Sequence, residues 1–290
     1  MSTLTITIDE RLRLVTAVLA ASSWPAEEQA QLTHAVHPQA KQVRHFVQPF
    51  ASHPAVSGAN EALLNGVPLA DLFSAARRCT WPGFTPTMPL PNVLKINDWV
   101  QSLADFARET SIESLFWAPQ TVVWQEAQAA LQTIFPDDRL LRALGQLGEV
   151  RAETAVALMP NLVFPALTPV VATAGDTLAL LLPPPKAVGE SPPWPFDEDP
   201  GWVVAIAAEQ LAPHLLAGEL AALDAARKPV AIHLAAAHCL AALLDNFEAQ
   251  AYLLRAKKAH NLPQLPALFA RLEEEVGSGN GRALATIFMS

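Results

Sequence analysis

The sequence predicts an α+β protein that is mainly α-helical and carries one small antiparallel sheet. Three observations lead to this prediction. Apolar residues recur at helical spacing through most of the chain. Strand-like runs are confined to the N-terminus and to the stretch from 154 to 182. Clusters of proline and glycine separate these segments and exclude regular structure between them.

The first half of the chain is expected to be mostly helical. Leu4–Ile8 alternates threonine with branched aliphatic residues, as strands do, and Asp9 is a suitable cap for a helix over Glu10–Ala21. Thr80–Asn92 contains four prolines and one glycine, which predicts a long surface loop. Further helices are expected over Gly58–Leu64, Leu69–Arg78, Ile96–Thr110 and Val122–Ile134.

The second half is expected to begin with strands and to end with helices. Strands are predicted over Thr154–Met159, Pro169–Thr173 and Thr177–Leu182, the last two joined as a hairpin. A proline-rich connector over Pro183–Pro200 follows. The predicted helices are Trp202–Leu216, against which the sheet is expected to pack, then Val230–His260 and Leu265–Val276.

This change from helix to strand suggests a division of the chain near residue 150. Residues 1–150 would form an N-terminal, mostly helical region, and residues 151–290 a strand meander followed by helices. At 290 residues the chain is also short enough for both parts to form one compact unit.

Composition narrows the classes of partner. Half of the residues are hydrophobic, so the chain can bury a large core. The net charge is −9 and the basic residues are scattered, which argues against nucleic acid as a partner. Cys79 and Cys239 are the only cysteines, too few for a disulfide framework or a thiolate zinc site. Both are expected to be buried, reduced thiols.

A membrane partner is not expected either. The segment Thr154–Gly175 carries no charge, but Pro160, Pro165 and Pro169 would break a spanning helix. The N-terminus lacks the basic and long apolar regions of a secretory signal, so a cytoplasmic location is expected.

One short pattern raises the question of lost catalysis. Glu209 stands between Ala208 and Ala212 with the spacing of the zinc-binding sequence H-E-x-x-H, in which two histidines four residues apart share one face of a helix. By itself this pattern is weak, because it arises by chance in alanine-rich helices. Taken alone, the pattern predicts only a helix that packs in the core.

Two other segments add to this pattern. Ile8–Thr16 and Phe46–Val56 resemble the opening and the aromatic H-P-A-V segments of a family of bacterial domains of unknown function, classed with the gluzincin zinc metallopeptidases. The resemblance implies a gluzincin-like helical region in the second half of the chain. It also implies a third zinc ligand on a later helix. Ala251–Ala256 is similar to the family's E-x-L-V-R-A stretch, with Ala251 at the ligand position.

On this resemblance all three ligand positions are alanine. Zinc is expected in the family but not in this chain, because a methyl group has no lone pair for a metal. Glu209 would remain as a vestigial general base. The implied protein is a metallopeptidase-like hydrolase scaffold without zinc or catalysis, a pseudoenzyme that binds a peptide or protein in its former cleft.

Two alternatives stay open, so the sequence does not decide whether the protein is an enzyme. A hydrolase could use a relocated site built from Glu209, His214, His238 and Glu248, if the C-terminal helices face each other. Alternatively, seven tryptophans and many prolines could form a purely structural interaction surface. Substrate, ligand and oligomeric state are not indicated.

The remaining histidines favour structural roles. His233 and His238 are five residues apart, about 140° around a helix, so they cannot bind one metal together from an undistorted helix. His238, Asp245 and Glu248 would share one broad face of the predicted Val230–His260 helix, where they could bind a cation. The resemblance implies that His53 makes a buried structural contact.

Overall fold

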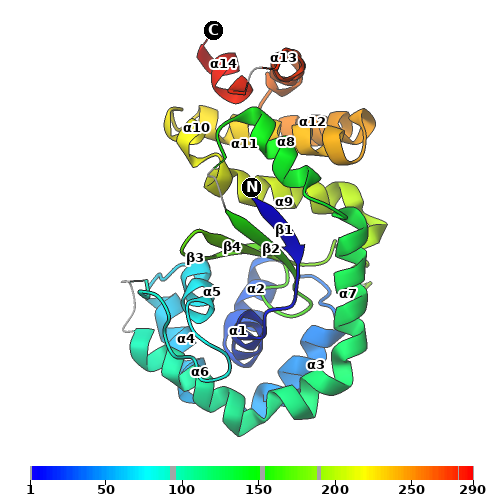
Figure 1. The fold of residues 1–290 in the computed structure, drawn as a ribbon. Coiled ribbons are helices and arrows are strands. Elements are labelled where there is room, and N and C mark those ends of the chain that lie inside the picture. Colours follow the sequence, from blue (N-terminus) through cyan, green and yellow to red (C-terminus); the bar gives the residue numbers. More distant parts are fainter. Residues whose placement is uncertain (1, 92–95, 151–153, 188–190, 280, 290) are drawn as a thin grey trace. The chain divides into compact units, whose positions relative to one another are not determined.

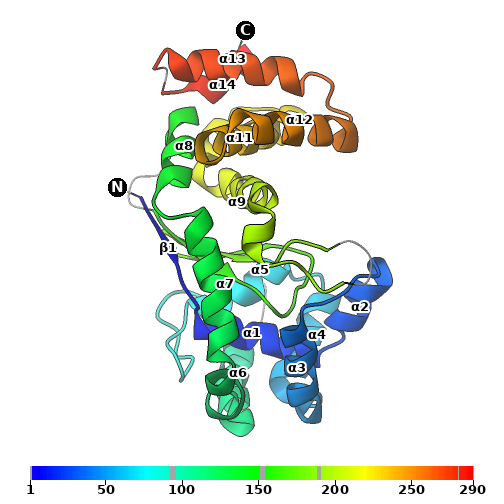
Figure 2. The ribbon, with the colours of Figure 1, turned by 90° about the vertical axis from the view of Figure 1, so that its right-hand side faces the viewer.

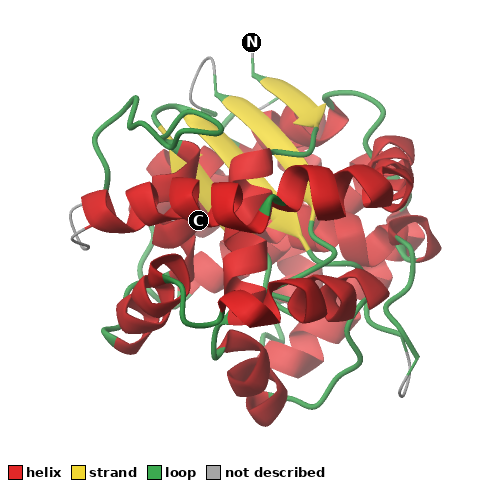
Figure 3. Ribbon diagram, turned by 90° about the horizontal axis from the view of Figure 1, so that it is seen from below, coloured by secondary structure: helices red, strands yellow, loops and turns green. Residues whose placement is uncertain are grey.

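The computed structural model describes residues 2–91, 96–150, 154–187, 191–279 and 281–289. Within these residues the protein is mainly helical, with 14 helices and a small four-stranded mixed sheet. Figure 3 draws the helices in red and the strands in yellow. The predicted α+β, mainly helical class is confirmed.

The chain divides into two compact units, and neither is continuous in sequence. The first, here called the sheet unit, comprises residues 5–132 and 156–198. The second, here called the C-terminal unit, comprises residues 1–4, 133–155 and 199–290. This division differs from a single cut near residue 150, because most of the sheet groups with the N-terminal helices. Each unit is described by itself.

Four strands form the sheet in the order β1-β2-β4-β3 (Figure 1). β3 and β4 form the predicted antiparallel hairpin, paired from Val170 with Leu181 to Ala174 with Thr177. Gly175 closes the hairpin with a φ of 57°, which glycine adopts without steric cost. The bounds are β1 Thr3–Ile6, β2 Ala155–Pro160, β3 Val170–Ala174 and β4 Thr177–Leu182.

The sheet is mixed, so the prediction of a purely antiparallel sheet is wrong. The backbone N–H of Asn161 donates to the carbonyl of Leu182 at 2.7 Å, which places the ends of β2 and β4 side by side. β3 lies between these two strands in sequence and at the edge of the sheet in space. The C-terminal ends of the neighbouring strands β2 and β4 therefore meet, so β4 runs parallel to β2.

Helix α1 is the centre of the sheet unit. The Asp9 side chain accepts a hydrogen bond from the Arg11 backbone at 3.0 Å and begins the helix, as predicted. Residues 12–20 are all buried, and α1 packs against α3, α4 and α5. The helices of this part are α1 Glu10–Ala21, α2 Trp24–Gln31, α3 Pro38–Val47, α4 Pro54–Leu64, α5 Leu69–Arg77, α6 Ile96–Thr110 and α7 Thr121–Ile134, the last of which runs into the C-terminal unit.

Short helical turns and loops join these elements. The predicted Thr80–Asn92 loop is irregular as far as Pro91, and Asn92 lies outside the described residues, as do residues 188–190 of the proline-rich connector. The Thr154–Gly175 segment forms β2, a loop and β3. The short turns are Gln48–Phe50, Glu113–Trp117, Ala118–Gln120 and Phe196–Glu198.

Helix α11 is the centre of the C-terminal unit. It packs against α8, α9, α12 and α13, and Figure 2 shows it beside α12. Asp199 caps α9 by accepting a hydrogen bond from the Trp202 backbone at 2.9 Å. The helices are α8 Arg139–Leu147, α9 Pro200–Leu215, α10 Ala217–Ala221, α11 Arg227–Leu243, α12 Asn246–His260, α13 Leu265–Gly277 and α14 Ala283–Met289.

The single helix predicted over Val230–His260 is two helices. α11 ends at Leu243, and the Asp245 side chain accepts a hydrogen bond from the Glu248 backbone at 2.9 Å to begin α12. An aspartate three residues before a glutamate is a helix-start signal, which the apolar periodicity on both sides concealed. His238 therefore does not share a helix face with Asp245 and Glu248.

The predicted packing of the sheet against the Trp202–Leu216 helix stays a prediction, because these elements belong to different units. Within the described ranges, none of the helices combines the length and apolar character needed to cross a membrane.

Candidate functional site

The two alanines that flank Glu209 are enclosed in the protein. Ala208 and Ala212 lie four residues apart on α9 and are both 0% exposed, so their predicted position on a buried helix face is confirmed. Their methyl groups pack in the core and offer no lone pair. These positions of α9 therefore do not fit the zinc ion of a gluzincin site.

Glu209 is held by side chains from two neighbouring helices. The Tyr252 hydroxyl on α12 donates to Glu209 Oε1 at 2.6 Å, and His233 Nδ1 on α11 lies 2.6 Å from the same hydroxyl oxygen. Because the single hydroxyl proton goes to the carboxylate, His233 Nδ1 must carry the proton it shares with Tyr252. The three side chains form a chain of hydrogen bonds from imidazole to phenol to carboxylate.

A second histidine borders this network. The His260 ring, at the end of α12, lies 4.6 Å from the His233 ring with an angle of 30° between the planes. His233 itself is 9% exposed, and none of its described neighbours hydrogen-bonds its Nε2 atom. We call Glu209, His233, Tyr252 and His260 the Glu209 network.

The surroundings favour a charged Glu209 and a neutral Tyr252. Burial opposes ionisation of Glu209, but contacts with His233 and Tyr252 and the charge of His260 outweigh it, so the pKa of this carboxyl lies below its ordinary value. Burial, with the charge and hydrogen bond of Glu209, raises the pKa of the Tyr252 hydroxyl. Such a pair can transmit a proton or position a histidine, and it also stabilises the contact between α9 and α12.

The structure brings Tyr252, rather than Ala251, to Glu209. Consecutive residues of a helix are about 100° apart, and Ala251 is only partly buried. Phe247 and Leu254, which share its side of α12, are exposed. Ala251 therefore lies toward the outer side of α12, and its assignment as a ligand position stays a prediction.

The four residues of the predicted relocated site do not form a common site in the structure. His238 is buried, with Nδ1 2.7 Å from Glu273 Oε1 and Nε2 3.0 Å from Gln146 Oε1. His214 is exposed at the end of α9. Glu248 lies near the start of α9, where a Cβ on Gly201 would be 2.6 Å from Glu248 Oε2. In the described parts of the chain, no hydrogen bond or ion pair links any two of Glu209, His214, His238 and Glu248.

In the part of the chain that the structure describes, no group of three His, Cys, Asp or Glu side chains is placed to hold a metal ion. Two histidines of the N-terminal third instead cap helices. The Nδ1 atoms of His37 and His53 accept backbone hydrogen bonds at the starts of α3 and α4, both at 3.1 Å. His53 is 8% exposed, which confirms its buried structural contact.

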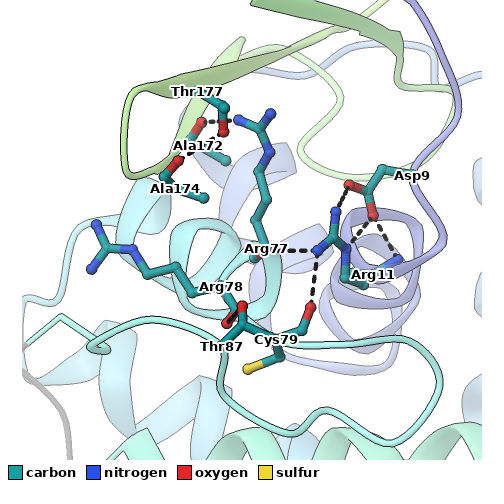
Figure 4. Close-up of polar contacts among 9 residues, drawn as sticks. All are labelled: Asp9, Arg11, Arg77, Arg78, Cys79, Thr87, Ala172, Ala174 and Thr177. Carbon is teal, nitrogen blue, oxygen red and sulfur yellow. Dashed lines mark hydrogen bonds and ion pairs between the residues drawn. The ribbon is translucent and has the colours of Figure 1, made fainter. Parts of the chain in front are cut away.

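An arginine cluster in the sheet unit was not predicted (Figure 4). Arg11 binds both carboxylate oxygens of Asp9, at 2.9 and 2.6 Å, and donates to the carbonyls of Arg77 and Cys79. Arg77 in turn donates to the carbonyl of Ala172 on β3 at 2.9 Å. These donors bind backbone carbonyls, so the cluster joins α1, α5 and the sheet rather than forming a ready anion site.

Both cysteines are free and buried, as predicted. Burial raises the pKa of the Cys79 thiol to about 11 and also raises the pKa of Cys239. Thiolate chemistry at neutral pH is therefore disfavoured at both positions.

Comparison with known proteins finds no match for this chain among protein-family models, curated proteins or solved structures.

Proposed function

We propose that the protein is a metallopeptidase-like pseudoenzyme of the cytoplasm that binds an apolar segment of a partner protein. The proposal keeps the resemblance to the gluzincins as its starting point and places the binding surface on α12. It requires neither zinc nor another cofactor, and neither nucleic acid nor a membrane as partner.

The environment of Glu209 supports the absence of peptidase chemistry. A general base for metal-bound water needs two neighbouring metal ligands on its own helix. Here those neighbours are buried alanines, and one oxygen of the carboxylate, Oε1, is engaged by Tyr252. Glu209 then stabilises the packing of α9, α11 and α12 instead of acting on water.

The observation that carries the binding role is the placement of exposed apolar side chains. Among the described residues of the C-terminal unit, the exposed large hydrophobic side chains are those of Leu244, Phe247 and Leu254. Phe247 is 77% exposed and Leu254 61%. Phe247, Ala251 and Leu254 follow the i, i+4, i+7 spacing of one helix face. We call these three residues and Leu244 the α12 stripe.

Charge beside the α12 stripe indicates the kind of partner. Arg255 and Lys258 are exposed and lie next to Leu254 at one end of the stripe, whereas the exposed Asp245 lies next to Leu244 at the other end. A positive group beside an apolar stripe favours a partner that has acidic residues beside its own apolar face. The proposed ligand is therefore an amphipathic helical segment whose acidic residues face the Leu254 end of the stripe.

Fluorescence anisotropy with two designed helical peptides tests this proposal. Both carry the same leucine stripe, one flanked by glutamates and the other by lysines. We expect saturable binding of the acidic peptide and at least 10-fold weaker binding of the basic one. The double variant Phe247→Ser, Leu254→Ser should lose affinity by about 10-fold or more, because anchoring side chains dominate such interfaces.

A matched control replaces Leu32 and Leu64, which are exposed apolar residues of the sheet unit, by serine. This control should bind like the wild type. If neither peptide binds, or if both double variants bind as well as the wild type, α12 is not the binding surface.

A hydrolase with a relocated site is the second candidate. The Glu209 network supports it, because His233 is oriented by Tyr252 and Glu209 while its Nε2 remains open for proton transfer. Of the residues expected from sequence, only Glu209 belongs to this network. Hydrolysis of activated esters and of casein by the wild type, lost in His233→Asn, would support this candidate. Equal rates in the two proteins would exclude it.

A further inference from the structure

The C-terminal unit contains a cavity that shares no residue with the Glu209 network or with the α12 stripe. Its volume is about 600 Å³, and it lies where α9 meets α10. The lining combines the charged side chains of Glu149, Glu219 and Arg282 with the apolar side chains of Val150, Leu215 and Ala217.

Glu219 is a buried carboxylate with one oxygen unused. The residue is 3% exposed, and its Oε1 accepts a hydrogen bond from Arg282 Nε at 3.3 Å. Its Oε2 is buried without a hydrogen-bond partner among the described residues. Burying a carboxylate oxygen without a donor costs free energy, so this position favours a donor that the chain itself does not supply.

The backbone beside Glu219 leaves room for this side chain. A Cβ at Gly148 would lie 2.4 Å from Glu219 Cγ and 3.0 Å from its Cδ. Any other residue at 148 would therefore displace the carboxylate. The buried position of Glu219 depends on a glycine in the adjoining segment.

Charge and shape together define the ligand. Among the described residues of the lining, two carboxylates stand against one guanidinium, which leaves one negative charge and favours a monocation. The apolar wall suits a short aliphatic body. A hard metal ion would need more oxygen ligands, and the described residues offer no group of three acidic, histidine or cysteine side chains for one.

We propose that this cavity binds a small primary ammonium compound with a short aliphatic body, whose ammonium group donates to the Glu219 carboxylate. Arg282 is 67% exposed, and its 3.3 Å contact is longer than the 2.7–2.9 Å typical of charge-assisted hydrogen bonds. The ammonium group can therefore replace or share this contact and reach the carboxylate that Arg282 partly covers.

Calorimetric titration of the full chain with n-butylammonium tests the proposal. We expect saturable binding at one site per chain, and none of n-butanol or butyrate at the same concentrations. Glu219→Gln should weaken binding at least 10-fold, because the amide has lost the negative charge. Gly148→Ala should also weaken it, because the added methyl group displaces Glu219.

Glu274→Gln, which neutralises an exposed carboxylate on α13, is the matched control and should bind like the wild type. The melting temperature of each variant verifies that it is folded. The proposal fails if the wild type shows no saturable binding or if Glu219→Gln binds equally well. It also fails if n-butanol binds as tightly, or if K⁺ or Mg²⁺ displaces the amine at equal concentration.

Discussion

The hydroxyl oxygen of Tyr252 lies 2.6 Å from Glu209 Oε1 and 2.6 Å from His233 Nδ1. One phenol thus joins three helices of the C-terminal unit through a carboxylate and an imidazole. Tyr252 is the only tyrosine of the chain and is 7% exposed. Its hydroxyl group contacts the buried His233 and the half-buried Glu209, so the stability of this unit should depend on the hydroxyl group itself.

Tyr252→Phe should lower the free energy of unfolding by about 1–3 kcal/mol, since it leaves a half-buried carboxylate without its donor. Chemical denaturation of the wild type and the variant measures this change. In the double variant Tyr252→Phe, Glu209→Ala, the observed loss should be smaller than the sum of the two single losses, because each substitution alone already removes the same hydrogen bond. Strictly additive losses would show that the hydrogen bond contributes nothing.

The pH dependence of stability should carry a contribution from Glu209. Its pKa is below the ordinary value in the folded state, so its stabilising effect is present above the unfolded-state pKa of about 4.3 and is lost as pH falls through the lower folded-state pKa. Glu209→Gln should therefore lose less stability than the wild type between about pH 5 and pH 3. Denaturation midpoints measured across this range provide the test, and parallel curves would contradict it.

Restoring metal ligands tests the relation to zinc peptidases. Ala208→His and Ala212→His combined with Tyr252→Glu should create a zinc site, because position 252 faces Glu209. The same two histidines with Ala251→Glu, the position that the sequence resemblance indicates, provide the comparison, and we expect weaker zinc binding there. Elemental analysis measures zinc per chain, and the wild type should hold no stoichiometric zinc.

The stability of the zinc variants should depend on the metal. Larger polar side chains at two core positions should cost about 1–3 kcal/mol each without metal, and zinc should restore part of the melting temperature. Tighter zinc binding by the Ala251→Glu variant would instead support position 251 as that of the third ligand. If both versions fold and neither binds zinc, α9 is only a core helix.

Arg13, in the sheet unit, should tolerate an apolar replacement. Its guanidinium carbon lies 4.6 Å from the ring centroid of Trp117 and 4.2 Å from that of Trp124, while Nε and Nη2 are buried without hydrogen-bond partners among the described residues. Burial lowers its pKa to about 10. The two rings compensate only part of the cost of burying this charge.

Arg13→Met, which retains much of the volume, should therefore change the free energy of unfolding by no more than about 1 kcal/mol or should increase it. Arg13→Ala should destabilise by about 2–5 kcal/mol, because it leaves a cavity between the two tryptophans. Thermal and urea denaturation of both variants measure these effects. A large loss in Arg13→Met would show that the cation itself is required.

Local signals in the sequence determined the class of fold and the bounds of many elements. The ends of the Glu10–Ala21 and Ile96–Thr110 helices and of the Thr177–Leu182 strand agree with prediction. Each depends on interactions between residues close in sequence, such as the Asp9 cap. The same reasoning predicted the buried helical positions of Ala208 and Ala212, because a helix that is apolar on nearly every side must lie in a core.

Only the tertiary structure decided which side chains meet. Glu209, His233 and Tyr252 come from three helices, and their contact depends on how each helix is rotated about its axis and where it crosses its neighbours. Neighbouring residues of a helix point about 100° apart. For this reason Tyr252 contacts Glu209, whereas Ala251 lies toward the outer side of α12. The parallel pairing of β2 with β4 and the cavity beside Glu219 likewise join segments far apart in the chain. Such contacts form through long-range packing, which local periodicity and capping do not encode.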